Sequence, residues 1–492
     1  MDAWRSLKLF NHVVPVVAII SVTALLGFFS AYDARVVLLV CGGALYLLLV
    51  LAALDTENIK KVLPLFLLLI LFQDTLMVIF GEAGRQLFSY LDEFFILVCL
   101  PALLLNFLRG EEIKGKSVII IITLITFLGT ASSLIQDVPP LIAMQGFLLM
   151  TKGLIYLLIF INIPFSKTDI NNTYKFIKGA ALVILLFAVV DFFIPAILRG
   201  FIGLGTSTDT KLLNLPSLQS LFVHPNIFGW FMVLCGAYAL AKYKAEQKIN
   251  YVYIATLFFL FAMMSFRFKT ALALLIVLMA FYLSSGLKKS LVYLLPASLL
   301  TFFIFIVFGD YFLGLTDITI NRYISADVSD SARKALYQVA LLIGAAEFPF
   351  GEGFGRYGGF IARQNYSPVY YDYNMNGIYG LKPEDPRWAT DTYWPHIIGE
   401  IGFIGTLLLL GLLIYLIVKL FRNYRIFTDT YLKAFVFFAG LALVHAVTES
   451  LGEPIFNSSP QNVFVFVIVG IAVSLISEEK ERRRNGARED AV

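Results

Sequence analysis

Apolar runs long enough to cross a bilayer recur along the chain, and they constrain the fold more than any other feature. A helix needs roughly 20 apolar residues to cross about 30 Å of hydrocarbon. About fourteen such runs are present, at approximately 13–30, 35–53, 62–80, 88–107, 117–136, 140–163, 177–199, 221–241, 249–266, 270–286, 290–308, 396–419, 430–449 and 461–477. Charged residues interrupt 88–107 and 140–163, and 270–286 is short. The sequence therefore predicts an all-α, polytopic integral membrane protein with about 12–14 transmembrane helices.

The composition excludes several other classes of protein. Hydrophobic residues make up 59% of the chain and charged residues only 15%, whereas soluble domains are about 25% charged. A soluble enzyme, a disordered scaffold and a nucleic-acid-binding protein are all excluded by this balance. The three cysteines, Cys41, Cys99 and Cys235, all lie in apolar runs, so no disulfide framework is expected.

Lysine and arginine residues are concentrated in alternate short loops, which predicts the orientation of the chain. Loops near residues 60, 114, 175, 244, 288 and 422 are basic, as is the tail that begins at Glu478. Because cytoplasmic loops carry the excess of positive charge, both termini are expected in the cytoplasm. The one long connection is then expected on the outer, periplasmic face.

The expected organisation has four parts. Residues 1–308 hold the first eleven helices, 309–395 form the large outer loop, 396–477 hold the last three helices, and 478–492 are a charged cytoplasmic tail. The loop contains a candidate amphipathic helix from Ser331, followed by a glycine-rich turn at 350–359 and a tyrosine-rich stretch. Loops of this length are usually functional or disordered, and its many aromatic residues argue against disorder.

The sequence contains none of the common motifs that bind a nucleotide or a metal. It lacks a Gly-Lys-Ser/Thr phosphate loop, His-Glu-x-x-His, Cys-x-x-Cys and Asp-x-Asp. Gly353-Phe-Gly-Arg-Tyr-Gly358 has the letters of a dinucleotide fingerprint, but no strand of a βαβ unit precedes it. This segment is interpreted as a turn, either a plain one or one that brings backbone amides near an anionic ligand. We expect no cofactor and no metal, and hence a substrate that is already activated.

Two cations at the outer end of a tight connection, Arg267 and Lys269, form a candidate anion site. Positive charge is otherwise scarce on the outer face, but such side chains also extend along helices to reach lipid headgroups. Five further charged residues lie inside apolar runs and could be buried pairs or a proton path, pairing being favoured: Asp74, Asp92, Glu93, Lys152 and Asp191.

Candidate polar groups also lie at two helix starts. His224-Pro-Asn226 opens one span, where the proline suits a first helical turn and the histidine could cap it or bind substrate. Asp391, His396 and Glu400 lie where the long loop re-enters the membrane.

Several of these segments together resemble the O-antigen ligase/polymerase family. In that family a large outer loop carries an arginine, an aromatic residue four positions on and a proline–glycine turn, as in the run from Ser331 to Gly355. The stretch from Asp391 to Gly405 resembles the motif that closes the loop, and segments 222–229 and 265–272 resemble two weaker ones. The resemblance covers roughly residues 220–420.

The resemblance implies a membrane glycosyltransferase that uses undecaprenyl-diphosphate-linked glycans on the periplasmic face of the bacterial inner membrane. It assigns diphosphate binding to Arg333 and to either Arg267 or Lys269, and it makes Asp391 the candidate base, with His396 the next candidate. Further substrate-binding candidates are His224, Asn226, Arg356, Tyr393, Trp394 and Glu400.

One departure separates the two activities of the family. Ligases have a histidine nine residues before the glutamate that corresponds to Glu400, and here that position is Asp391. This favours a polymerase of repeat units, with a chain-length regulator and a flippase as expected partners. The alternatives are a ligase that transfers glycan to lipid A core and, from another class, a polysaccharide flippase or transporter.

Overall fold

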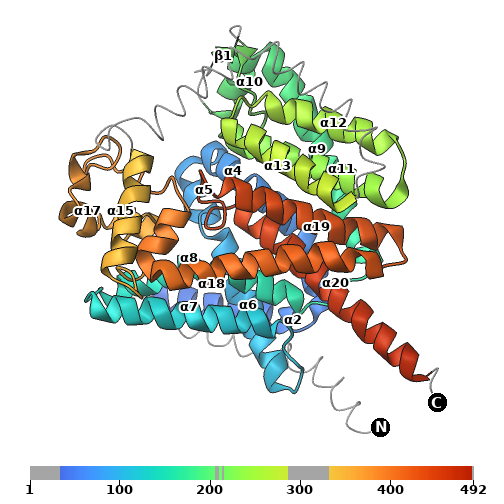
Figure 1. The fold of residues 1–492 in the computed structure, drawn as a ribbon, viewed down its shortest axis with the longest axis horizontal. Helices are drawn as coiled ribbons and strands as arrows, with labels where there is room; N and C mark the ends of the chain where they lie inside the picture. Colours follow the sequence, from blue (N-terminus) through green and yellow to red (C-terminus); the bar gives the residue numbers. More distant parts are fainter. Residues whose placement is uncertain (1–33, 205–209, 213–214, 286–331, 490–492) are drawn as a thin grey trace. The chain divides into compact units, whose positions relative to one another are not determined.

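The structure is a computed structural model that describes residues 34–204, 210–212, 215–285 and 332–489. Apart from a short antiparallel pair of strands, β1 (Thr210–Leu212) and β2 (Leu215–Pro216), the regular elements of these residues are all helices (Figure 1). The expected all-α class is thereby confirmed.

Seven helices of the described residues are long and apolar enough to cross a membrane. An eighth span results if α2 (Ala34–Ala53) and α3 (Thr56–Leu71), which meet at a bend of 108°, count as one. The seven are α5–α6 (Gly81–Phe88 and Leu91–Leu108), α7 (Lys116–Ile135), α8 (Pro140–Ile161), α9 (Lys167–Phe193), α18 (Trp394–Asn423, continued by η4, Tyr424–Ile426), α19 (Thr430–Glu449) and α20 (Gln461–Glu489). The chain thus has the helices of a polytopic membrane protein.

Two expected spans are broken in the structure. Residues 62–80 divide at Phe72 into α3 and α4 (Gln73–Ile79). Here the buried Gln73 amide donates to the carbonyl of Phe88, because a buried polar group needs a hydrogen-bond partner. Residues 177–199 divide before Pro195, which begins α10 (Pro195–Ile202), since a residue that precedes proline disfavours helical geometry.

The remaining expected spans are shorter than predicted, begin later than predicted or fall outside the described residues. Residues 249–266 and 270–286 form α12 (Asn250–Met263) and α13 (Phe268–Ser285), which are short apolar helices. Helix α11 (Pro225–Glu246) corresponds to 221–241. The expected spans at 13–30 and 290–308 lie outside the described residues.

The chain divides into two compact units. The first comprises Met1–Lys61 and Phe94–Glu112, and the second comprises Val62–Glu93 and Ile113–Val492. In the first unit the Tyr46 hydroxyl donates to the carbonyl of Leu97 at 3.0 Å, which ties α2 to α6. All candidate site residues belong to the second unit.

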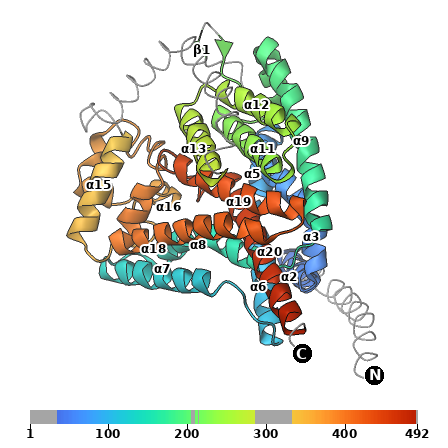
Figure 2. The ribbon, with the colours of Figure 1, turned by 45° about the vertical axis from the view of Figure 1, so that its right-hand side comes forward.

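Within the second unit, α19 is the central helix and contacts α11, α13, α18 and α20 (Figure 1). Most of its side chains are buried. Helix α15 (Ala332–Ala346) packs against α18, and α7 lies along α18 (Figure 2).

The segment between α15 and α18 is folded and has a small core of its own, and we call it the outer layer because it lies at the edge of the second unit (Figure 1). It contains α16 (Phe360–Gln364), α17 (Val369–Asp372) and η3 (Met375–Gly377). Leu336 and Ile343 of α15 pack with Tyr357, Tyr370 and Leu381, all fully buried. The amphipathic helix and the aromatic-rich segment expected from the sequence are therefore present, and their apolar faces bury each other.

Candidate functional site

Arg333 and Asp391, which are 58 residues apart in sequence, form an ion pair in the structure. The Nη2 atom of Arg333 lies 2.5 Å from Oδ2 of Asp391. Arg333 is in the first turn of α15, whose buried face orients the helix, and Asp391 lies three residues before α18. Both side chains are half-buried, with about a quarter of each accessible to solvent (23% and 27%). The pair is therefore accessible to a ligand.

A second ion pair joins Lys269 to a carboxylate that sequence reasoning missed. Lys269 lies in the first turn of α13, and its Nζ is 2.5 Å from Oε1 of Glu453 and 3.2 Å from the carbonyl of Gly452. The amide Nδ2 of Asn226 donates to the same Glu453 oxygen. The signal that was available is a glutamate–proline step just after an apolar span, at Glu453-Pro454.

The start of α11 is fixed by His224. Its Nδ1 accepts a hydrogen bond from the backbone N–H of Asn226 at 3.2 Å, which caps the helix. The capping interpretation of His224 is therefore confirmed, and the cap places the Asn226 side chain against Glu453. Arg267 lies two residues before Lys269 and is half-buried.

Both ion pairs flank one short segment, residues 450–460 between α19 and α20, which we call the α19–α20 connection. Tyr337, one helical turn after Arg333, donates its hydroxyl to the carbonyl of Leu451 at 2.7 Å. Trp394 Nε1 donates to Ser450 Oγ at 3.0 Å. Gly452 and Glu453, which contact Lys269 of α13, follow directly along the chain. The starts of α15, α18 and α13 therefore all contact this connection.

His396 and Glu400 are brought together, but away from solvent. Their Nε2 and Oε2 atoms are 3.1 Å apart, and their side chains are 2% and 1% exposed. Asn457 of the α19–α20 connection lies 3.1 Å from His396 Nδ1. With the Asn457 amide as donor to Nδ1, the remaining ring proton is on Nε2 and faces Glu400. This buried arrangement positions α18 against the connection.

The glycine-rich turn is held by the protein through its own backbone amides. The N–H groups of Gly351 and Phe354 donate to Ser132 and Ser133 of α7. Those of Glu352 and Gly353 donate to the carbonyls of Gly399 and Glu400. Four consecutive amides are thus already used, so the plain-turn interpretation of this segment fits the structure.

Gly359 shows how closely this turn packs. A Cβ atom there would lie 2.9 Å from Cε1 of His396, so only glycine lets the backbone approach the imidazole ring. Arg356 of the same turn is half-buried.

The aromatic side chains between Tyr366 and Trp394 separate into buried and exposed groups. Tyr393 and Trp394 are 3% and 9% exposed, and Tyr393 packs on Phe456 with ring centroids 5.1 Å apart. Both therefore belong to the packing of α18 on the connection. By contrast, Tyr371 and Tyr379 are half-exposed or more, and the Tyr379 ring meets Trp388 edge-on. These rings form the exposed aromatic surface of the outer layer.

The charges inside the apolar runs are mostly paired. Lys152 of α8 lies 2.8 Å from Asp92 and 3.0 Å from Glu93. Asp191 of α9 accepts from Arg199 at 2.8 Å. Structural pairing, the interpretation favoured from sequence, is confirmed for these residues.

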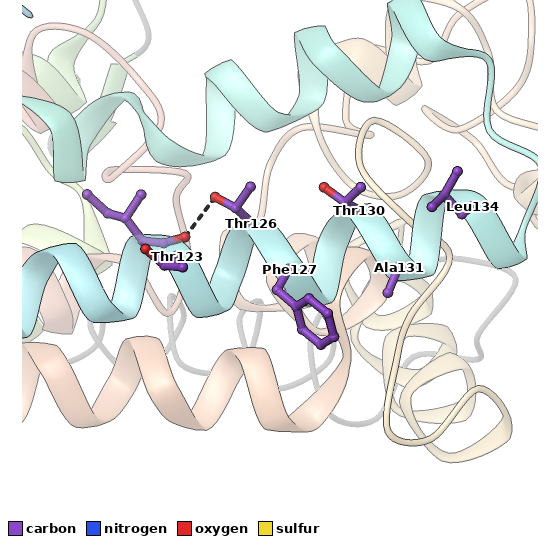
Figure 3. A pocket seen from close by; sticks show the side chains of 7 residues that line it. Thr123, Thr126, Phe127, Thr130, Ala131 and Leu134 are labelled. Atoms are coloured by element: carbon purple, nitrogen blue, oxygen red, sulfur yellow. Dashed lines mark hydrogen bonds between the residues drawn. The ribbon is translucent and has the colours of Figure 1, made fainter.

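A groove of about 480 Å³ runs along α7 and contains none of the candidate residues. Its lining includes Phe127 and Leu134, which are largely exposed (Figure 3). Thr126 donates its hydroxyl to the carbonyl of Ile122 at 2.7 Å, so this polar group is satisfied within the helix and the groove presents mainly carbon atoms. Such a surface suits lipid chains.

The described residues contain no group of three or more His, Cys, Asp or Glu side chains that could hold a metal ion. No family model matches the chain, and comparison with curated proteins gives no match either. The chemistry open to the site therefore follows from its geometry. It offers two cations able to bind an anion and two carboxylates able to accept a proton.

Proposed function

We propose that the protein is an inner-membrane glycosyltransferase that polymerises undecaprenyl-diphosphate-linked oligosaccharide repeat units on the periplasmic face. The observation that supports this most is that two ion pairs lie beside the α19–α20 connection. Arg333–Asp391 is joined to it through the neighbouring Tyr337 and Trp394, and Lys269 binds its Glu453. These residues come from segments far apart in sequence, and they fall in the region that resembles the O-antigen ligase/polymerase family. A diphosphate leaving group needs cations, and an acceptor hydroxyl needs a base.

In the proposed reaction, a hydroxyl of the acceptor repeat unit attacks the anomeric carbon of the growing chain. The carboxylate of Asp391 takes the hydroxyl proton as the new glycosidic bond forms. The bond between the anomeric carbon and the diphosphate oxygen breaks, and the lipid diphosphate leaves with the electron pair. The guanidinium of Arg333 and the ammonium of Lys269 stabilise the charge that develops on the leaving group.

The outer layer supplies a surface for the glycan. Tyr371, Tyr379 and Trp388 lie on the same folded segment as Asp391 and present accessible ring faces or edges. Aromatic rings stack on the apolar faces of sugars because both surfaces lose water on contact. The buried His396 and Glu400 position the start of α18. The proposed partner proteins are a chain-length regulator and a flippase.

The test is the glycan ladder of cells that carry only an Asp391→Asn variant. Asparagine keeps the size of the side chain but is not basic, and loss of a general base costs about 10²–10⁴-fold in rate. We expect long glycans to be replaced by single repeat units on lipid A core, at normal protein level. Wild-type ladders from Asp391→Asn would remove Asp391 as the base. Accumulation of lipid-linked polymer with none on core would instead identify a ligase.

A further inference from the structure

The pairing of Lys269 with Glu453 has a consequence for ligand binding. An anion site is normally expected to present an unoccupied cation, yet the Lys269 ammonium already contacts a carboxylate at 2.5 Å. The same Glu453 oxygen accepts from the Asn226 amide, so one carboxylate occupies both donors. A phosphate that uses these donors must therefore compete with Glu453.

The surroundings make this competition physically significant. The side chains of Lys269 and Glu453 are 23% and 14% exposed, so the pair is only weakly screened by water. The hydrogen bond to Glu453 orients the Asn226 amide, whose Oδ1 atom is buried and has no hydrogen-bond partner among the described residues. Glu453 also lies in a connecting segment and not within a regular helix, so its side chain can move away without breaking a helix.

We propose that Glu453 is a displaceable counter-ion that occupies Lys269 and Asn226 until a diphosphate displaces it. This inference rests on the proposed function, in which the site binds a lipid diphosphate. A diphosphate carries more negative charge and more acceptor oxygens than a monophosphate, so it competes better for the ammonium and the amide. A monophosphate or a lipid headgroup with a single phosphate, which competes less well, should displace Glu453 less at the same concentration.

The experiment measures binding of farnesyl diphosphate and farnesyl monophosphate to the full-length protein in detergent. In Glu453→Gln the competing charge is absent, so both ligands should bind more tightly, the diphosphate by about three- to tenfold. The monophosphate should gain no more than the diphosphate, because displacement of Glu453 costs the same free energy for either ligand. Glu384→Gln is the matched control, because it removes one negative charge at an exposed position of the outer layer, and it should leave both affinities unchanged.

A second measurement uses the wild-type protein and does not depend on how a variant folds. A carbodiimide joins an ammonium and a carboxylate that are in contact, so mass spectrometry should detect a Lys269–Glu453 cross-link. Saturating farnesyl diphosphate should suppress the cross-link, whereas the monophosphate at the same concentration should suppress it less. The Lys167–Asp429 pair, with its ammonium and carboxylate 2.6 Å apart, provides an internal control whose cross-link should not change.

The outcomes separate this inference from the proposed function. The wild-type protein could bind the diphosphate while Glu453→Gln binds it no more tightly, or the ligand could leave the cross-link unchanged. Either result would overturn the counter-ion role alone. Weaker binding in Glu453→Gln would also overturn it and would make Glu453 a support for Lys269. Absence of diphosphate binding by the wild-type protein would count against both proposals.

Discussion

At the scale of single residues, the Arg333–Asp391 pair combines the two functions that the proposed reaction requires. The guanidinium can transfer its hydrogen bonds from the carboxylate to phosphate oxygens, because its donors form a planar fork that fits either group. The released carboxylate is then beside the bound diphosphate. Neither residue is fully buried, which distinguishes this pair from Asp191–Arg199, where the two side chains are 0% and 2% exposed.

Substitution of Arg333 tests this interpretation. Arg333→Ala should lower polymer formation by about 10²–10³-fold, the typical effect of removing one charge-stabilising donor. Arg333→Lys should restore only part of the activity, since a point charge lacks the fork. The measurement is the glycan ladder, with protein level in the membrane as control. Equal activity of the alanine variant and the wild type would exclude Arg333 from the site.

Glu352 in the glycine-rich turn makes folding stability depend on pH. Burial raises the pKa of the Glu352 carboxyl, and the neighbouring carboxylates of Glu347 and Asp372 raise it further, while Arg356 opposes them. The folded protein therefore binds a proton at Glu352 at pH values where the unfolded chain has lost it. The free energy of unfolding falls as the pH rises through this window, above the ordinary glutamate pKa.

Glu352→Gln should accordingly raise the melting temperature at about pH 8 and change it little at about pH 4, where the carboxyl is protonated in both states. Thermal unfolding of the detergent-purified protein at the two pH values is the measurement. A larger gain at the acidic pH would contradict the assignment.

At the scale of elements, α18 depends on a kink that only glycine allows. Gly402 has φ 70° and ψ −176° inside the helix, a conformation essentially restricted to glycine. A Cβ atom there would also lie 2.2 Å from the carbonyl oxygen of Phe350. The kink lets the glycine-rich turn approach the helix backbone, where Gly399 and Glu400 accept its amides.

We therefore expect Gly402→Ala to lower the free energy of unfolding by about 2–3 kcal/mol or more. Gly411→Ala, in the same helix, is the matched control. Its Cβ would meet nothing within 4 Å, and alanine favours a helix over glycine by up to about 1 kcal/mol. Thermal unfolding compares the two variants, and similar losses in both would show that the kink is not required.

At the scale of the whole molecule, the proposed function requires the outer layer and the basic loops to face opposite sides of the membrane. Cysteines introduced at Asn365 and Lys248, both exposed, test this in a variant whose own three cysteines are replaced by serine. A membrane-impermeant maleimide should label Asn365→Cys in intact spheroplasts and Lys248→Cys only after lysis. Labelling of both from the same side would contradict the periplasmic placement of the site.

The sequence by itself determined the helical class and the membrane character, and it supplied most of the candidate residues. Long apolar runs with few charged residues can be recognised from a short stretch of sequence. Such segments form helices in the hydrocarbon of a bilayer, where backbone groups cannot bond to water. They also locate unusual charges such as Lys269 and Asp391, whereas Arg333 was singled out by the resemblance to a family. The breaks between helices at Phe72 and Pro195 also have local causes, but a hydropathy profile averages over neighbouring residues and does not show them.

The tertiary structure alone decided which of these residues meet and which are buried. Glu453 was missed because its significance comes from Lys269 and Asn226, which are 184 and 227 residues away in sequence. His396 looked like a catalytic group, yet the glycine-rich turn and Asn457 enclose it. Contacts between distant segments depend on how helices pack, and packing is set by the whole arrangement of side chains, which no local pattern contains.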